Sequence, residues 1–264
     1  MVHPPKSARL ALPQVTVCAV TSVNVAATLH ALEECLAQIE FASCKLFTHA
    51  TVEQSEHPGI QIVPIRPVTS SAAYSDYILN SLIDHVKTSH CLVVQWDGHV
   101  INADKWRWDF LDYDYIGASW PQFSDGHDVG NGGFSLRSTR LMQACRIEGF
   151  IPLHPEDIAI GRLNRHWLEQ RGMHFAPRAL ADIFSTERAG AITASFGYHG
   201  VWNMPEAIGV EGFWQRYRDL DERSTIWTDH FNLMRYVARG AYPVRRGLRM
   251  VVDRLFDAVI KPIR

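Results

Sequence analysis

Residues 91–99 are CLVVQWDGH, an apolar run followed at once by polar residues and a glycine. An apolar run this short, bounded by a turn signal, predicts a buried strand over residues 91–95. Asp97 follows that strand directly and His99 comes two residues later, where oxygen and nitrogen donors could bind a divalent cation. The Asp-Gly pair also fits an ordinary turn, so these residues alone leave both interpretations open.

The residues before this strand alternate between strand and helix patterns. Residues 14–21 predict a buried strand, residues 25–39 a helix with leucines on one face, and residues 73–87 a second helix. Shorter strands are expected over residues 45–48 and 60–65. This alternation predicts an α/β fold, in which helices flank a mostly parallel mixed sheet. Ligands of such folds bind beyond the carboxyl ends of the strands.

The chain changes character after about residue 205. The residues that follow predict aromatic helices, and residues 235–264 are rich in arginine, with apolar residues that can share one helical face. We expect an N-terminal extension over residues 1–13, a main domain over residues 14–205, and a helical, basic region over residues 206–264. The basic tail either rests on anionic lipid or packs on the domain as a solvated helix.

The composition excludes several classes of protein. The 264 residues are 47% hydrophobic, enough for a packed core, and the formal net charge of -2 offers no basic excess for binding nucleic acid. The five cysteines are scattered and never form a CxxC pair, which argues against a disulfide framework and a zinc knuckle. No apolar stretch has the length of a signal peptide or a spanning helix, so we expect a cytoplasmic protein.

A glycine-rich segment, DVGNGGFSLRS, occupies residues 128–138. Its glycines permit a ligand to approach the backbone closely, and Asn131 offers an amide to sugar hydroxyls. The segment has neither the GxGxxG spacing of a dinucleotide-binding loop nor the GK[ST] of a P-loop. Taken alone, it fits an ordinary glycine hairpin without any function better than a ligand-binding loop. A helix capped by Ser138 is expected to follow it.

A second segment, HPEDIAIGR, begins a helix predicted over residues 156–170. Glu156 and Asp157 stand in its first turn, where the helix dipole stabilises carboxylates whether or not they take part in chemistry. One of them could take the proton of an acceptor hydroxyl as that hydroxyl attacks a sugar carbon. A pair of carboxylates also fits a glycoside hydrolase, and this alternative stays open.

A third segment, FGYHG, spans residues 196–200 and is followed by Trp202. Two glycines flank His199 and predict a tight loop. A lone histidine is more often structural than a ligand, so a metal-binding role for His199 requires that it meets Asp97 in space. Trp202 either stacks on a sugar ring or fills the core.

These segments, in this order, resemble glycosyltransferases of the GT-A fold. More narrowly, the chain is similar to an uncharacterised bacterial glycosyltransferase-like family with a Gln-x-Asp strand end, a DYIGAxW segment and a GNGGFSLR segment, here residues 95–97, 114–120 and 130–137. Beta-1,4-galactosyltransferases are a more distant likeness, with a glycine-rich segment before a Glu-Asp pair. The resemblance covers residues 14–205 and implies that they form a GT-A-like, Rossmann-like catalytic domain.

The resemblance implies an inverting hexosyltransferase of polysaccharide biosynthesis that moves a sugar from a nucleotide-sugar donor, with a UDP-sugar favoured, to a glycan or lipid-linked glycan. It implies Asp157 as the general base, with Glu156 helping to hold the acceptor. The other implied residues are Thr21, Ser22, Gln95, Asp97 and Arg137 for the donor, Trp120, Asn131, Gly132, Gly133 and Trp202 for the acceptor, and Asp97, His99 and His199 for a metal.

The chain departs from the family pattern at the DxD element, because Asp97-Gly98-His99 lacks the second carboxylate. A Mn²⁺ or Mg²⁺ cofactor is expected, whereas a metal-independent variant would need basic side chains for the diphosphate, such as Arg137 and Arg162. The incomplete element also supports an alternative, a nucleotide-sugar or glycan-binding protein without turnover. The basic C-terminus adds the expectation of a peripheral contact with the inner face of the membrane.

Overall fold

The computed structural model describes residues 9–260. Most of the expected N-terminal extension, residues 1–8, lies outside the described residues, as do Lys261 and Arg264 of the basic tail. The first strand begins at Leu10, four residues earlier than the apolar pattern predicts, because its first residues pair with the start of the second strand.

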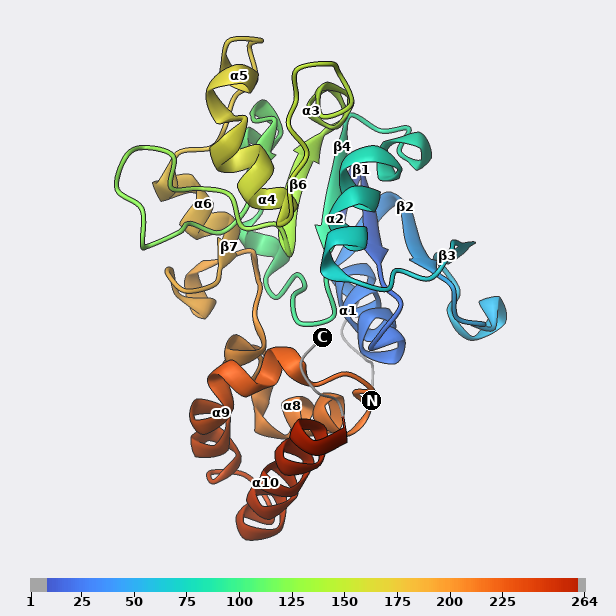
Figure 1. The fold of residues 1–264 in the computed structure, drawn as a ribbon, viewed down its shortest axis with the longest axis vertical. Helices are drawn as coiled ribbons and strands as arrows, with labels where there is room; N and C mark the ends of the chain where they lie inside the picture. Colours follow the sequence, from blue (N-terminus) through green and yellow to red (C-terminus); the bar gives the residue numbers. More distant parts are fainter. Residues whose placement is uncertain (1–8, 261–264) are drawn as a thin grey trace, which may run out of the picture.

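A six-stranded mixed sheet lies at the centre of the protein, in the order β3-β2-β1-β4-β6-β5 (Figure 1). Neighbouring strands are parallel from β3 to β4, whereas β6 runs antiparallel to β4 and to β5. The predicted mostly parallel mixed sheet is therefore confirmed. The strands are β1 (Leu10–Val20), β2 (Ile39–Thr48), β3 (Ile60–Pro64), β4 (His90–Val94), β5 (Tyr115–Ile116) and β6 (Phe134–Ser138), with a separate pair, β7 (Ser185–Thr186) and β8 (Gly197–Tyr198).

Helices cover both faces of this sheet because its central strands are apolar on both sides. Leu92 and Val94 of β4 belong to the hydrophobic cluster beneath α1, and Cys91 and Val93 belong to the cluster beneath α2. The helices are α1 (Val25–Gln38), α2 (Ser71–Asn80), α3 (Thr139–Ala144), α4 (Glu156–Ile158), α5 (Arg165–Glu169), α6 (Arg178–Phe184), α7 (Met204–Ala207), α8 (Gly209–Arg218), α9 (His230–Val237) and α10 (Pro243–Ile260).

The single helix expected over residues 156–170 is interrupted. A wide π-helical turn, Ala159–Leu163, separates α4 from α5. Gly161 lies in this turn, and the ring of Trp120 packs so close that a Cβ on Gly161 would be 3.1 Å from it. The sequence of the segment contains no signal for this tertiary contact.

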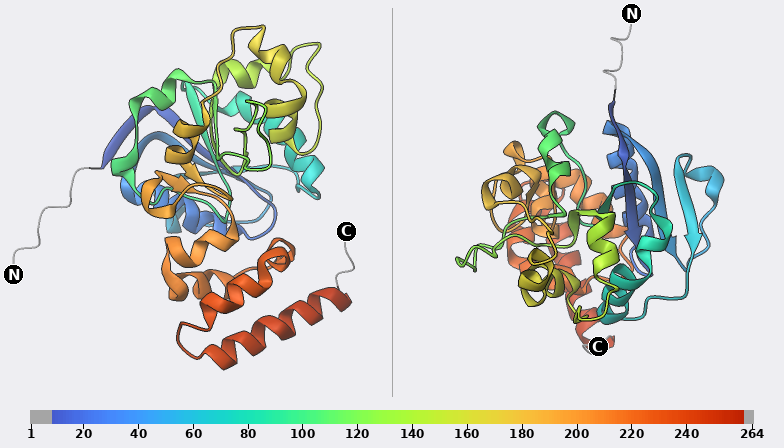
Figure 2. Two further views of the ribbon diagram at one scale, coloured as in Figure 1. Left: turned by 90° about the vertical axis from the view of Figure 1, so that its left-hand side faces the viewer. Right: turned by 90° about the horizontal axis from the view of Figure 1, so that it is seen from above.

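The C-terminal helices pack around a hydrophobic cluster at one end of the molecule (Figure 2). Phe213 of α8, Leu233 of α9 and Met250 of α10 belong to it, and α1 contributes Ala27. Because the cluster also includes buried residues from Ile192 onward, the domain boundary at residue 205 stays a prediction. None of the helices within residues 9–260 is long and apolar enough to cross a membrane.

Candidate active site

The ends of β4 and β6 carry the first residues of the candidate site. Val94, the last residue of β4, lies opposite Phe134, the first of β6. The pairing continues beyond the strands, because the Gln95 amide donates to the Gly133 carbonyl over 3.0 Å. The Gln-Trp-Asp segment and the glycine-rich loop are thereby fixed side by side, although they are distant in the sequence.

His199 joins these two segments. Its Nε2 lies 3.4 Å from Asp97 Oδ1 and 3.2 Å from Gln95 Oε1. The imidazole also lies directly against Gly133, where a Cβ would come within 2.0 Å of Nε2. A metal-binding role for His199 required that it lies beside Asp97, and in the structure it does.

The other ring nitrogen of His199 faces a carboxylate that no sequence motif singles out. Nδ1 lies 3.4 Å from Glu187 Oε1, and the amide of Asn203 donates to the carbonyls of both Glu187 and His199. Burial alone would lower the pKa of His199, but the Asp97 and Glu187 carboxylates outweigh burial and raise it to about 10. Residues 185–190 are STERAG, and nothing in this pattern marks Glu187 as functional.

Asp157 approaches the same loop from the opposite side. Its Oδ2 accepts a hydrogen bond from the Gly132 amide at 3.2 Å, and its Oδ1 accepts one from Ile158 at 2.8 Å. Burial raises the pKa of Asp157 to about 6, and the neighbouring Glu156 carboxylate adds to the shift. The side chain is half-buried and keeps access to solvent, so Asp157 can exchange a proton near neutral pH.

Glu156 has a different environment from Asp157. It is buried, and its carboxylate accepts from the guanidinium of Arg137 at 3.0 Å and from the Ser75 hydroxyl at 3.3 Å. Arg137 is 1% exposed and also donates to the Gly132 carbonyl. This buried ion pair therefore holds the glycine loop in place through the Gly132 carbonyl. Neither partner presents its charge to a ligand in this arrangement.

The residues around His199 Nε2 have the donor types of a Mn²⁺ or Mg²⁺ site. Asp97 Oδ1 is buried and has no hydrogen-bond partner among the described residues, and Gln95 Oε1 approaches the same nitrogen. Glu187 on the far side of the ring resembles the carboxylates that orient metal-ligating histidines. These residues therefore fit a cation held by two oxygens and one nitrogen, although within residues 9–260 no three His, Cys, Asp or Glu side chains are grouped to hold a metal.

His99, the predicted second ligand, does not join this group. Its Nδ1 lies 2.8 Å from the Val100 carbonyl, and its ring packs edge-on against Tyr198 with centroids 5.0 Å apart. Burial lowers the pKa of His99, which favours the neutral form of a packed core histidine. Gln95, rather than His99, therefore lies with Asp97 around His199 Nε2.

The predicted donor residues Thr21 and Ser22 follow β1, the parallel neighbour of β4, at the same edge of the sheet. The Thr21 hydroxyl donates to the Val23 carbonyl, and the Ser22 hydroxyl accepts from the Val68 amide at 2.7 Å. Within residues 9–260 neither side chain is hydrogen-bonded to Asp97. The two residues shape the loop after β1, and their role in donor binding stays a prediction.

Two predicted acceptor residues support the glycine loop from inside. Trp120 is buried, and a Cβ on Gly130 would come within 2.4 Å of its ring. Asn131 Oδ1 accepts from the Gly133 amide at 3.1 Å and closes the turn. Neither side chain presents an open face to a sugar, so both act in this structure by holding the loop.

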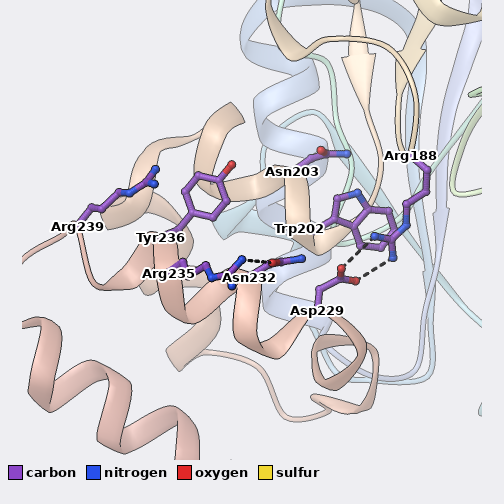
Figure 3. Close-up of a pocket in the computed structure, with 8 residues that line it drawn as sticks. All are labelled: Arg188, Trp202, Asn203, Asp229, Asn232, Arg235, Tyr236 and Arg239. Atoms are coloured by element: carbon purple, nitrogen blue, oxygen red, sulfur yellow. Dashed lines mark hydrogen bonds and ion pairs between the residues drawn. The ribbon is translucent and has the colours of Figure 1, made fainter.

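Trp202 lies in a neighbouring pocket of about 350 Å³ rather than beside Asp157 (Figure 3). Its Nε1 donates to the Glu187 carbonyl at 3.1 Å, which connects the pocket to the His199 loop. The Arg188 guanidinium lies 3.3 Å from the centre of the Trp202 ring and pairs with Asp229 at 2.9 Å. The residues lining the pocket are Arg188, Trp202, Asn203, Asp229, Asn232, Arg235, Tyr236 and Arg239.

This pocket is positively charged, because three arginines face one aspartate. Arg162, which the sequence suggested together with Arg137 for a metal-independent site, lies elsewhere: it pairs with Asp125 at 2.7 Å and covers the ring of Phe123. The arginines of the pocket are Arg188, which follows Glu187, Arg235 of α9, and Arg239 just after α9.

Comparison with known proteins identifies one family. The model of the family described as "Protein of unknown function (DUF5672)" matches residues 59–199, more than half of the chain. These residues include β4, the glycine-rich loop, Asp157 and His199. No curated protein matches the chain in sequence.

Three solved structures are similar at low identity. A mannosyltransferase, PcManGT from Pyrobaculum calidifontis in complex with GDP-Man and Mn²⁺, has 12% identity and a TM-score of 0.41, over 99% of this chain and 79% of that one. A glycosyltransferase involved in glycosylation of the major capsid of PBCV-1 has 12% identity and a TM-score of 0.45, over 78% and 100%. The apo-form glycosyltransferase GlyE of Streptococcus pneumoniae TIGR4 has 14% identity and a TM-score of 0.42, over 83% and 63%.

Proposed function

We propose a function from the site, because the chain belongs to the DUF5672 family, whose description assigns none. The protein transfers a sugar from a nucleotide-sugar donor to a hydroxyl of a glycan or lipid-linked glycan, and the configuration at the anomeric carbon is inverted. One observation carries the proposal. The Gly132–Gly133 loop contacts the imidazole of His199 on one side and the carboxylate of Asp157 on the other. The groups suited to a leaving diphosphate therefore lie against Gly133, and the base suited to an attacking hydroxyl lies against the adjacent residue, Gly132.

Asp157 acts as the general base in this proposal. Its carboxylate takes the proton of the acceptor hydroxyl as the hydroxyl oxygen attacks the anomeric carbon, and the bond from that carbon to the diphosphate oxygen breaks. Because the pKa of Asp157 is raised to about 6, the residue is both ionised at neutral pH and basic enough to accept the proton. Arg137 and Glu156 keep it in position through the Gly132 carbonyl and the adjacent backbone.

The donor binds at the edge formed by β1 and β4, with a UDP-sugar favoured and its base toward Thr21 and Ser22. Gln95, Asp97 and His199 lie where the diphosphate would leave. A Mn²⁺ or Mg²⁺ ion held by these three residues would offset the charge that builds on the leaving nucleotide. Glu187 orients His199 from the far side of the ring.

The attacking hydroxyl of the acceptor has to lie beside Asp157, so the pocket around Trp202 binds a more distant part of the acceptor. Arg188, Arg235 and Arg239 line this pocket, so we expect an acceptor with an anionic group, such as the phosphate of a lipid-linked glycan. The glycoside hydrolase alternative is less compatible with the site, because Arg137 and Ser75 enclose Glu156 and leave only Asp157 accessible.

Asp157→Asn tests the proposal. We expect transfer to fall by roughly 100-fold or more, the usual effect of losing a general base, whereas calorimetry shows unchanged affinity for the donor. The matched control is Asp112→Asn, since Asp112 is exposed and distant from the loop. Native transfer by Asp157→Asn would remove the proposed base. Binding of the nucleotide sugar by the unmodified protein, with neither transfer nor donor hydrolysis, would favour the binding-protein alternative.

A further inference from the structure

The last helix, α10, has its charged side toward the rest of the protein. Arg246, Met250 and Asp257 are its buried residues. Arg246 forms two hydrogen bonds with the Glu211 carboxylate, at 2.7 and 2.5 Å, and Asp257 lies 3.8 Å from Arg223. Polar contacts and one methionine therefore attach α10 to the protein. An ordinary surface helix instead turns its apolar side toward the core.

The outward side of α10 is apolar along its whole length. Residues 244, 248, 251, 252, 255 and 259 recur at the spacing of one helical face, and their exposed fractions range from 37% to 82%. Met250, also apolar, is turned inward and fully buried. The exposed apolar residues are Val244, Leu248, Val251, Val252, Leu255, Phe256 and Val259.

The uncompensated charge that borders this face is positive. The two carboxylates of α10, Asp253 and Asp257, lie on the docked side, where Asp253 accepts from the Tyr217 hydroxyl at 2.9 Å. Arg245 is exposed beside the apolar face and Arg254 lies over the Phe231 ring, whereas the exposed Arg249 pairs with Asp253 at 2.9 Å. A large exposed apolar face marks a contact with another surface, and a basic border selects a negatively charged one.

We propose that the outward face of α10 lies flat on a lipid bilayer that contains anionic headgroups. The apolar side chains enter the boundary between headgroups and acyl chains, and Arg245 and Arg254 meet the phosphates. Phe231 of α9 extends the surface, since it is 71% exposed and lies beneath the Arg254 guanidinium. In Figures 1 and 2, α10 is the outermost element at its end of the molecule, so a flat surface can reach it.

The charge pattern favours lipid over a second copy of the chain. Two copies packed through this face would bring Arg245 and Arg254 of one helix close to the same arginines of the other. Like charges at close range oppose association, and no carboxylate of α10 points outward to offset them. An anionic bilayer supplies the missing opposite charge.

Vesicle sedimentation with the full chain tests this inference without any sugar transfer. We expect the protein to pellet with vesicles of equal parts phosphatidylcholine and phosphatidylglycerol, and far less with phosphatidylcholine alone or at high salt. The double variant Leu248→Gln, Leu255→Gln should stay in the supernatant. The control Ile147→Gln, Ile151→Gln replaces two apolar residues that are similarly exposed but lie away from α10, and it should pellet like the unmodified protein.

Two results would overturn the inference. One is equal pelleting of the α10 variant and the unmodified protein, or no pelleting of either. The other is a dimer, seen by light scattering, that the α10 variant converts to a monomer; the face would then bind a second copy. Circular dichroism and thermal unfolding of the variants confirm that the substitutions leave the fold intact.

Discussion

The imidazole of His199 occupies the space that a side chain would need at Gly133, with Nε2 only 2.0 Å from the position of a Cβ. Glycine at this position is therefore a steric requirement, because backbone and ring cannot otherwise share the space. The same loop places the Gly132 amide on Asp157. One pair of glycines thus sets the separation between the two chemical centres.

Gly133→Ala should displace His199 from Asp97. The added methyl overlaps the ring, so the ring has to move, and we expect loss of both metal-dependent stabilisation and sugar transfer. A fitting control is Gly247→Ala, because the nearest atom to a Cβ there is Met234 Cε at 3.8 Å. Alanine also favours the helix, so this control should be as stable as the unmodified protein or more so. Full activity of Gly133→Ala would show that the ring position is unimportant.

Mn²⁺ should raise the thermal unfolding midpoint of the unmodified protein and leave that of Asp97→Asn unchanged. Because the pKa of His199 is raised to about 10, the cation has to displace a proton, and its effect should grow as the pH rises from about 6 to about 8. The Asp112→Asn protein should respond like the unmodified one. An identical response of Asp97→Asn would exclude Asp97 as a ligand.

The rate of transfer should fall as the pH falls through about 6, because protonated Asp157 cannot accept the proton of the acceptor. The raised pKa has an opposite effect on stability. The folded state binds this proton more tightly than the unfolded state, so the stability that Asp157 contributes declines as the pH rises from about 4 to about 6. Asp157→Asn should therefore be inactive and yet at least as stable at neutral pH. A thermal scan beside the rate profile measures both effects.

Arg137→Met should destabilise the protein by about 3–5 kcal/mol, because it leaves the Glu156 carboxylate buried without its partner. The double variant Arg137→Met, Glu156→Gln removes the unpaired charge and should recover part of that loss. Arg107→Met breaks an exposed ion pair with Asp109 and should change stability little. Urea unfolding compares the three proteins, and equal losses in the single and double variants would argue against a penalty from the buried charge.

The order of strands and helices was predictable, because each has a local pattern. The apolar run of β4 and the leucines of α1 fix both elements and the parallel part of the sheet. The antiparallel direction of strand β6 could not be predicted, since a five-residue buried strand has no periodicity that reveals its direction. The resemblance placed Asp97, the glycine loop, Asp157 and His199 at one site, and the geometry brings them together.

The parts of the site that were not predictable depend on side-chain direction and tertiary contact. The metal role of His99 was inferred from its closeness to Asp97 in sequence, but the chain turns its ring toward Tyr198. Arg137 was expected at the diphosphate, and burial against Glu156 makes it a support instead. Glu187 has no motif at all. Each outcome depends on contacts between segments that are distant in the sequence.

Gln95, Asp97 and the glycine loop adjoin the ends of β4 and β6 in the central sheet, while the arginine-lined pocket lies against helices that pack on a cluster of their own. Substitutions in those helices can accumulate without straining the sheet edge. Over evolutionary time, the lining of this pocket is thus free to change while the residues around the glycine loop stay the same. The helical end is accordingly where diversification within the family should concentrate.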